Sequence, residues 1–101
     1  MTETRIQQGE AGRLQVVGDL SFQTVPQVWA DSEAVFQKVP QLEIDLRDVS
    51  RSDSAGLALL VEWMRQARRA GKVIRFYNIP RQMLAIARVS SLDQILPLAR
   101  D

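Results

Sequence analysis

The chain has 101 residues, of which 46% are hydrophobic and 25% are charged. This length and this balance are typical of one small globular domain, and they exclude a disordered or fibrous protein. The formal net charge is +1, which argues against a nucleic-acid-binding protein, because binding to phosphate backbones needs a concentrated basic face. We therefore expect a single domain over residues 1–101.

Cysteine and histidine are both absent from the sequence. Their absence excludes disulfides, thiolate chemistry, zinc-finger sites and the usual general base at neutral pH. We therefore expect a protein without catalytic residues, metal ions or cofactors. No apolar run approaches the roughly 20 residues that span a bilayer, and residues 1–5 lack the pattern of a secretory signal. These features predict a cytoplasmic protein with no direct membrane insertion.

The predicted elements begin with a β-hairpin. Residues 5–8 and 13–17 have the composition of short strands, and the turn between them, residues 9–12, contains two glycines. A helix is predicted next, since its apolar and small residues recur at helical spacing and form one face. Pro40 ends this helix. That face consists of Val25, Val28, Trp29, Ser32, Val35, Phe36 and Val39.

The second half of the chain alternates strands with helices. Residues 42–46 and 73–77 predict two apolar strands, and a helix between them runs from the end of a turn at residues 48–53 to about Ala70. Residues 92–98 predict one more turn or short helix. A further helix before that tail carries Met83, Ile86 and Ala87 on one side. This order predicts an α/β fold, a small mixed β-sheet opened by an N-terminal hairpin, with helices packed mainly on one face.

The most specific pattern lies where the turn meets the second predicted helix. Residues 52–60 read Ser-Asp-Ser-Ala-Gly-Leu-Ala-Leu-Leu, which places a hydroxyl at the start of an apolar helix. Backbone N–H groups are free there and the helix dipole is positive. One of Ser52, Asp53 or Ser54 can therefore act as a helix cap. Alternatively, a phosphate on Ser54 would be accepted at the helix start while repelling an acidic partner, which indicates a switchable contact.

The same predicted helix contains three more residues, Gly56, Leu59 and Trp63, that indicate either a surface contact or tight packing. Gly56 stands in the first turn, where glycine costs up to about 1 kcal/mol relative to alanine. It therefore indicates a close approach, either by a partner or by another part of the fold. Leu59 and Trp63 lie four residues apart, on the flank of the main apolar stripe. They are either the margin of the core or a docking anchor, since tryptophan is enriched at interface hot spots.

The order of strand, polar turn, hydroxyl and apolar helix resembles that of STAS domains, the fold of the anti-sigma-factor antagonists. The resemblance covers nearly the whole chain, including residues 17–20, 42–46 and 53–57 and the helix end at Ala70-Gly71. In that family the Ser or Thr after the Asp is the regulatory residue, which here is Ser54. The resemblance implies a partner-binding and regulatory site made of Ser52, Asp53, Ser54, Ala55, Gly56, Leu59 and Trp63.

Within this family the sequence looks most like the small cytoplasmic subunits of ABC transporters that move phospholipids between the bacterial inner and outer membranes. Residues 56–60 and 95–97 carry that closer match. It implies a non-catalytic subunit that binds the transporter's ATPase, stabilises its active dimer and reaches the membrane permease only through the ATPase.

Two other functions stay open from the sequence. The first is an anti-sigma-factor antagonist regulated by phosphorylation of Ser54. The second is a small-ligand or nucleotide-sensing module that uses the same helix start. Both would place their chemistry at the start of the second predicted helix, so the same residues are candidates in every case.

Overall fold

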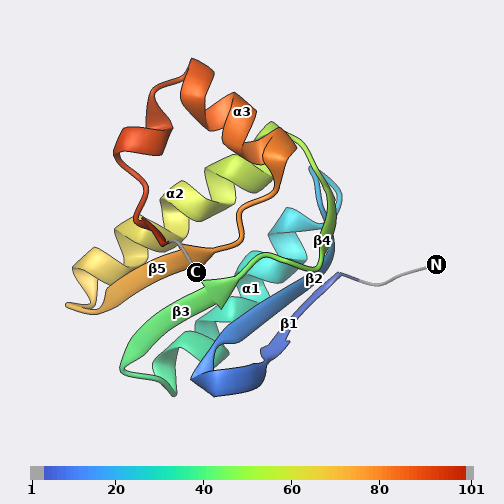
Figure 1. The fold of residues 1–101 in the computed structure, drawn as a ribbon. Helices are drawn as coiled ribbons and strands as arrows, with labels where there is room; N and C mark the ends of the chain where they lie inside the picture. Colours follow the sequence, from blue (N-terminus) through green and yellow to red (C-terminus); the bar gives the residue numbers. More distant parts are fainter. Residues whose placement is uncertain (1–3, 100–101) are drawn as a thin grey trace.

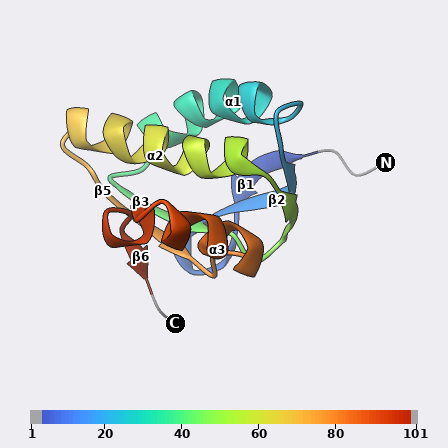
Figure 2. The ribbon, with the colours of Figure 1, turned by 90° about the horizontal axis from the view of Figure 1, so that it is seen from above.

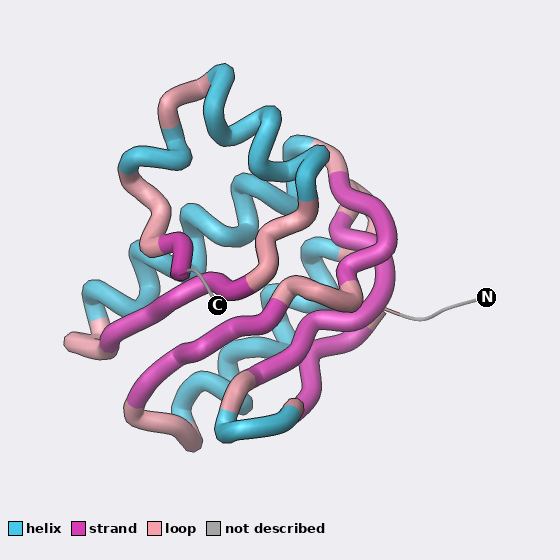
Figure 3. Tube along the Cα trace, in the orientation of Figure 1, coloured by secondary structure: helices cyan, strands magenta, loops and turns pink. Residues whose placement is uncertain are grey.

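The structure of the chain, a computed structural model, describes residues 4–99. Six strands form one mixed sheet within this range (Figure 1). The strands are β1 (Arg5–Gln8), β2 (Leu14–Leu20), β3 (Gln41–Asp45), β4 (Val49–Ser52), β5 (Val73–Tyr77) and β6 (Leu98–Ala99). The α-helices are α1 (Val25–Gln37), α2 (Ser54–Arg69) and α3 (Arg81–Val89), and the short 3-10 helices are η1 (Glu10–Gly12) and η2 (Leu92–Gln94). Figure 3 shows the alternation of strands and helices along the chain.

The sheet is mixed because β1 and β2 pair antiparallel, whereas every other pair within the described residues is parallel. Across the sheet the strands follow the order β1-β2-β3-β5-β6. β3 pairs with the beginning of β2, at Leu14 and Gln15, and β4 pairs with its end. The predicted N-terminal hairpin and mixed sheet are therefore confirmed.

One face of the sheet is covered and the other is open. In β2 every second residue from Leu14 to Leu20 is buried, which is the pattern of a sheet packed on one side. Figure 2 shows α1 and α2 side by side over the covered face. α3 packs against α2. The prediction of helices mainly on one face is confirmed.

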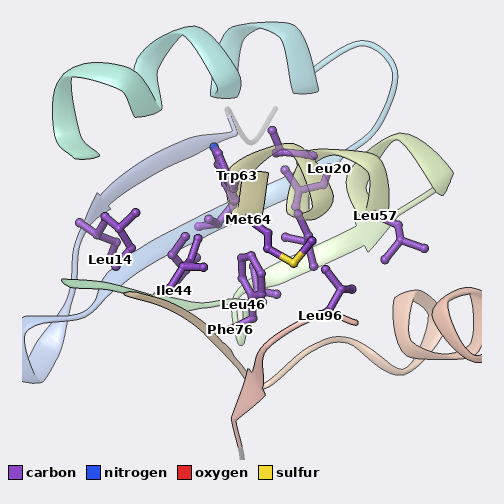
Figure 4. Close-up of a cluster of buried hydrophobic side chains, with 14 of the residues drawn as sticks. Leu14, Leu20, Ile44, Leu46, Leu57, Trp63, Met64, Phe76 and Leu96 are labelled. Atoms are coloured by element: carbon purple, nitrogen blue, oxygen red, sulfur yellow. The ribbon is translucent and has the colours of Figure 1, made fainter. Parts of the chain in front are cut away.

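The core fills the space between the sheet and α2. Side chains from the strands, among them Leu14, Ile44 and Phe76, meet Trp63 and Met64 of α2 (Figure 4). Each of these five is at most 4% exposed. α2 is the longest helix at 16 residues, and no helix within residues 4–99 has the length and hydropathy to cross a membrane. α2 packs on the sheet through β4 and β5 and has α1 and α3 at its sides.

Two predicted segments differ from the structure. The turn predicted at residues 48–53 contains the strand β4, which pairs with the end of β2. Its two middle residues, Ser50 and Arg51, are exposed and polar, so the sequence gives little sign of a strand there. The tail predicted at residues 92–98 as a turn or short helix contains η2 and then reaches the edge strand β6.

Candidate functional site

The start of α2 is capped by Asp53. Its Oδ1 accepts a hydrogen bond from the backbone N–H of Ala55 at 2.9 Å. Its Oδ2 accepts one from the backbone N–H of Phe22 at 3.4 Å, and its own N–H donates to the carbonyl of Leu20 at 3.1 Å. Asp53 therefore satisfies a free N–H group of α2 and also ties the start of α2 to the chain between β2 and α1.

Ser54 is the first residue of α2 and is exposed. Its hydroxyl makes no hydrogen bond to any residue that the structure describes. Capping therefore does not explain this side chain, because Asp53 already does that work. Ser54 Oγ is accessible for a partner's hydrogen bond or for a modifying group.

An apolar hollow of about 600 Å³ lies between α1 and α2, and Ser54 belongs to its lining. We call it the α1–α2 groove. Phe22, at one wall, is 73% exposed, which is unusual for an aromatic side chain of a soluble protein. The only charged side chain in the lining is Glu62. The full lining consists of Phe22, Val25, Pro26, Trp29, Ser54, Ala55, Ala58, Leu59 and Glu62.

Leu59 and Trp63 belong to the core. They are 2% and 0% exposed, because α1 covers the flank of α2 on which they lie. The indole Nε1–H of Trp63 donates to Ser32 Oγ of α1 at 2.9 Å. Of the two interpretations left open by the sequence, the docking anchor is therefore wrong for Trp63. Leu59 contributes to the lining of the groove as a buried side chain.

Gly56 is explained by packing inside the fold. A Cβ added to Gly56 would lie 3.0 Å from Leu20 Cβ, 3.1 Å from the Leu20 carbonyl oxygen and 3.2 Å from Met83 Cε. The end of β2 and helix α3 therefore press on this turn of α2. The close approach predicted from the sequence is made by the protein's own residues.

The remaining predicted residues divide between surface and interior. Ser52 is 7% exposed, and its Oγ has no hydrogen-bond partner among the described residues. Ala55 is half-buried and lines the groove beside Ser54. Among the seven predicted site residues, the surface of the site is thus formed by Asp53, Ser54 and Ala55.

Several lining residues of the groove were not predicted as site residues. Phe22, Pro26 and Glu62 lie in none of the predicted motifs. Ala58 lies within the pattern of residues 52–60 but was not a predicted site residue, and Trp29 was predicted only as part of the apolar face of the first helix. The groove arises only when α1 and α2, which are distant in sequence, lie side by side. The signal that the sequence did offer was Phe22, a large aromatic residue in a polar turn and outside any helical or strand periodicity.

A second, polar hollow of about 770 Å³ lies where the turn between β1 and β2 meets the loop after β3. There the guanidinium of Arg13 lies 3.6 Å from the ring centroid of Tyr77 and 3.9 Å from a carboxylate oxygen of Asp45. The Tyr77 hydroxyl donates to Glu43 at 2.9 Å. These four side chains therefore form a connected polar network. Among the described residues no acidic cluster could hold a metal ion.

Comparisons with known proteins agree with this fold. A family model described as "Mlab, STAS domain" matches residues 4–97. The chain is 31% identical over 81 residues to the intermembrane phospholipid transport system binding protein MlaB of Haemophilus influenzae, a match that covers 75% of this chain and 76% of the relative.

Two solved structures have the same fold at low sequence identity. The anti-sigma factor antagonist SpoIIAA, in its unphosphorylated form, gives a TM-score of 0.62 at 19% identity, covering 91% of this chain and 96% of its own. A proposed anti-sigma factor antagonist of Thermotoga maritima gives a TM-score of 0.72 at 15% identity, covering 95% of this chain and 84% of its own. The family match, the MlaB-like sequence and the shared fold lead to one conclusion: the chain belongs to the STAS domain family and is of the MlaB type.

Proposed function

We propose that this chain is a non-catalytic subunit of a Mla-type ABC transporter for phospholipids, and that it binds and stabilises the transporter's ATPase. The observation that carries the proposal is the exposed apolar groove between α1 and α2, with the free hydroxyl of Ser54 in its lining. In this proposal the protein is cytoplasmic and reaches the inner membrane through the ATPase and the permease. Its role is to support the transport that maintains outer-membrane lipid asymmetry, without a cofactor of its own.

The exposed apolar surface supports a docking role. Contiguous apolar surface at a hollow marks interaction sites on soluble proteins. Burying one phenylalanine side chain contributes about 1.5–3 kcal/mol, and Phe22 leaves 73% of its surface available for that contribution. Aromatic residues at the centre of an interface are frequent hot spots. Phe22 is therefore the expected apolar anchor of the ATPase contact.

Ser54 supplies the polar part of the same contact. Its hydroxyl can both donate and accept a hydrogen bond. Ser54 Oγ makes no hydrogen bond to the described residues, so it is available to a partner. A polar group beside apolar surface orients a partner, because a mismatched partner leaves it unsatisfied. We therefore expect Ser54→Glu to weaken ATPase binding, since it adds a charge that must be desolvated in the interface.

A matched pair of alanine substitutions tests the proposal. Ala58 is an exposed alanine of α2 in the groove, and Ala85 is an exposed alanine of α3 outside it. We expect Ala58→Glu to raise the Kd for the purified ATPase subunit by on the order of tenfold or more, because it places a charge in the apolar groove. Ala85→Glu should leave the Kd unchanged in the same calorimetric titration. Equal, unchanged affinities of the two variants would overturn the groove as the docking site.

A second function, that of an anti-sigma-factor antagonist, is supported by the same exposed serine. Ser54 Oγ is accessible to a kinase, and a phosphate at the first residue of α2 would meet the positive end of the helix dipole. This function requires that a partner kinase with ATP transfers one phosphate to Ser54. Mass spectrometry of the chain after incubation with the kinases of its own cell tests this, with Ser54→Ala as the control. An unmodified Ser54 would count against this second function.

A further inference from the structure

A chain of two hydrogen bonds joins α2 to the backbone of α1. The indole Nε1–H of Trp63 donates to Ser32 Oγ at 2.9 Å. Ser32 Oγ in turn donates to the carbonyl oxygen of Trp29 at 2.8 Å. Ser32 and Trp63 are both 0% exposed, so water does not compete for the bond between them. The bond to the Trp29 carbonyl is part-buried. The hydroxyl of Ser32 thus links the two helices that form the groove.

This link lies directly behind the groove. Trp29, whose carbonyl accepts the second bond, is also a wall residue of the groove on the α1 side. Leu59, one helical turn before Trp63, lines the groove from α2. The bonded pair therefore connects one wall of the groove to the helix that carries the other wall.

The hydrogen bonds restrict α1 more tightly than apolar contact does. The ring of Phe36 packs against that of Trp63, with centroids 5.5 Å apart and planes inclined by 54°. Apolar contacts of this kind tolerate small shifts, since cores repack when volume is conserved. A hydrogen bond weakens steeply with distance and angle, and a buried indole N–H without an acceptor is costly. A shift of α1 along α2 would break this bond.

We propose that Ser32 and Trp63 are positioning residues that fix the width of the α1–α2 groove and thereby set the affinity for the partner that docks there. This proposal rests on the proposed function, because it takes the groove as the docking site. Neither side chain reaches the partner, so both act through Trp29 and Leu59. If their role were purely structural, substitutions of Ser32 or Trp63 would lower stability and leave the affinity for the partner unchanged.

The first test separates affinity from stability. Ser32→Ala removes the acceptor for Trp63 Nε1–H and the donor to the Trp29 carbonyl. We expect it to raise the Kd for the ATPase subunit about tenfold, measured at a temperature where the variant is fully folded. The control is Ile74→Val, a core truncation in β5 at a buried residue outside the groove lining. It should lower the melting temperature and leave the Kd unchanged.

The second test reads the groove without a partner. The chain contains two tryptophans, so 5-fluorotryptophan labelling gives two ¹⁹F NMR signals, which Trp63→Phe assigns. In Ser32→Ala the Trp29 signal should shift or broaden and respond more strongly to a soluble paramagnetic quencher. In Ile74→Val it should stay as in the unsubstituted protein. An unchanged Trp29 signal in folded Ser32→Ala would overturn the proposal, whatever the partner is.

The outcomes distinguish this proposal from the proposed function. If Ala58→Glu loses ATPase binding while Ser32→Ala keeps it, only the positioning role fails. If neither variant changes binding, the groove itself fails as the docking site. Should Ser32→Ala not fold, Trp63→Phe takes its place, because it removes the donor and keeps a ring against Phe36. Unchanged affinity of a folded Trp63→Phe would then overturn the positioning role.

Discussion

At the scale of single residues, the start of α2 separates a structural side chain from an available one. Asp53 accepts bonds from two backbone N–H groups, those of Ala55 and Phe22. Ser54, the next residue, makes no bond among the described residues and is exposed. Asp53 therefore stabilises the start of α2, whereas Ser54 is available to a partner, and substitution of each residue tests its role separately.

We predict that Asp53→Ala lowers the free energy of unfolding by about 0.5–2 kcal/mol, which is the usual effect of removing a helix cap. Ser54→Ala should change it by no more than about 0.5 kcal/mol, as expected for a surface residue without such a role. Urea unfolding followed by circular dichroism measures both. The opposite order of the two effects would mean that Ser54 is the cap of α2 in solution.

Gly56 gives a second residue-scale prediction. Alanine is better than glycine within a helix by about 1 kcal/mol, so Gly56→Ala would stabilise α2 if space were free. The added Cβ, however, would lie 3.0 Å from Leu20 Cβ and 3.1 Å from the Leu20 carbonyl oxygen. Overpacking of a tight core contact costs about 1–3 kcal/mol. We therefore expect a net loss of stability, measured as a lower melting temperature. A higher melting temperature would show that the end of β2 shifts to make room for the added Cβ.

At the scale of elements, the two walls of the groove come from segments that only the fold brings together. The local features of the site could be predicted from the sequence, because a polar cap followed by an apolar helix is contained in residues 52–60. The burial of Trp63 could not be predicted from the periodicity of α2, since it depends on α1 covering that flank. Ser32 was the available sign, because a polar residue on an apolar helix face requires a buried partner.

The groove predicts different roles for two exposed apolar side chains. Phe22 precedes α1 at the groove and is 73% exposed, while Val89 ends α3 and is 90% exposed. Phe22→Ala should weaken binding to the ATPase subunit by on the order of tenfold or more, as at an interface hot spot. Val89→Ala should leave affinity unchanged, and neither should alter stability by more than about 0.5 kcal/mol. Equal losses of affinity from the two variants would place the contact elsewhere or spread it over both surfaces.

At the scale of the whole molecule, the sheet divides the protein into a helical side and a polar side. In β3 the alternation that produces this division could be predicted from the sequence, because Leu42 and Ile44 stand between polar residues. In β2 and β5 apolar residues also stand side by side, so the sequence predicts strands there but does not say which face of each is buried. β4 could not be predicted, since its middle residues are polar and its pairing depends on the end of β2. The groove lies on the helical side, and the polar side carries the network around Tyr77.

This division makes a prediction about where the partner docks. Arg75 of β5 is exposed, stands opposite Glu43 of β3 in the sheet, and alternates with the buried residues Ile74 and Phe76. Arg75→Glu places like charges across a strand pair, which destabilises a sheet by about 0.2–1 kcal/mol. A small loss of stability is therefore expected in denaturant unfolding. Affinity for the ATPase subunit should stay unchanged, because the substitution lies on the face opposite the groove.

The groove variant Ala58→Glu, titrated beside Arg75→Glu, provides the comparison. Both introduce a glutamate at an exposed residue, one on the helical side and one on the polar side. If affinity falls for Ala58→Glu alone, the partner contacts the α1–α2 side, as an apolar and exposed surface requires. If the affinity falls for Arg75→Glu instead, the partner contacts the polar face of the sheet. Phe22 would then be exposed for a reason unrelated to this partner.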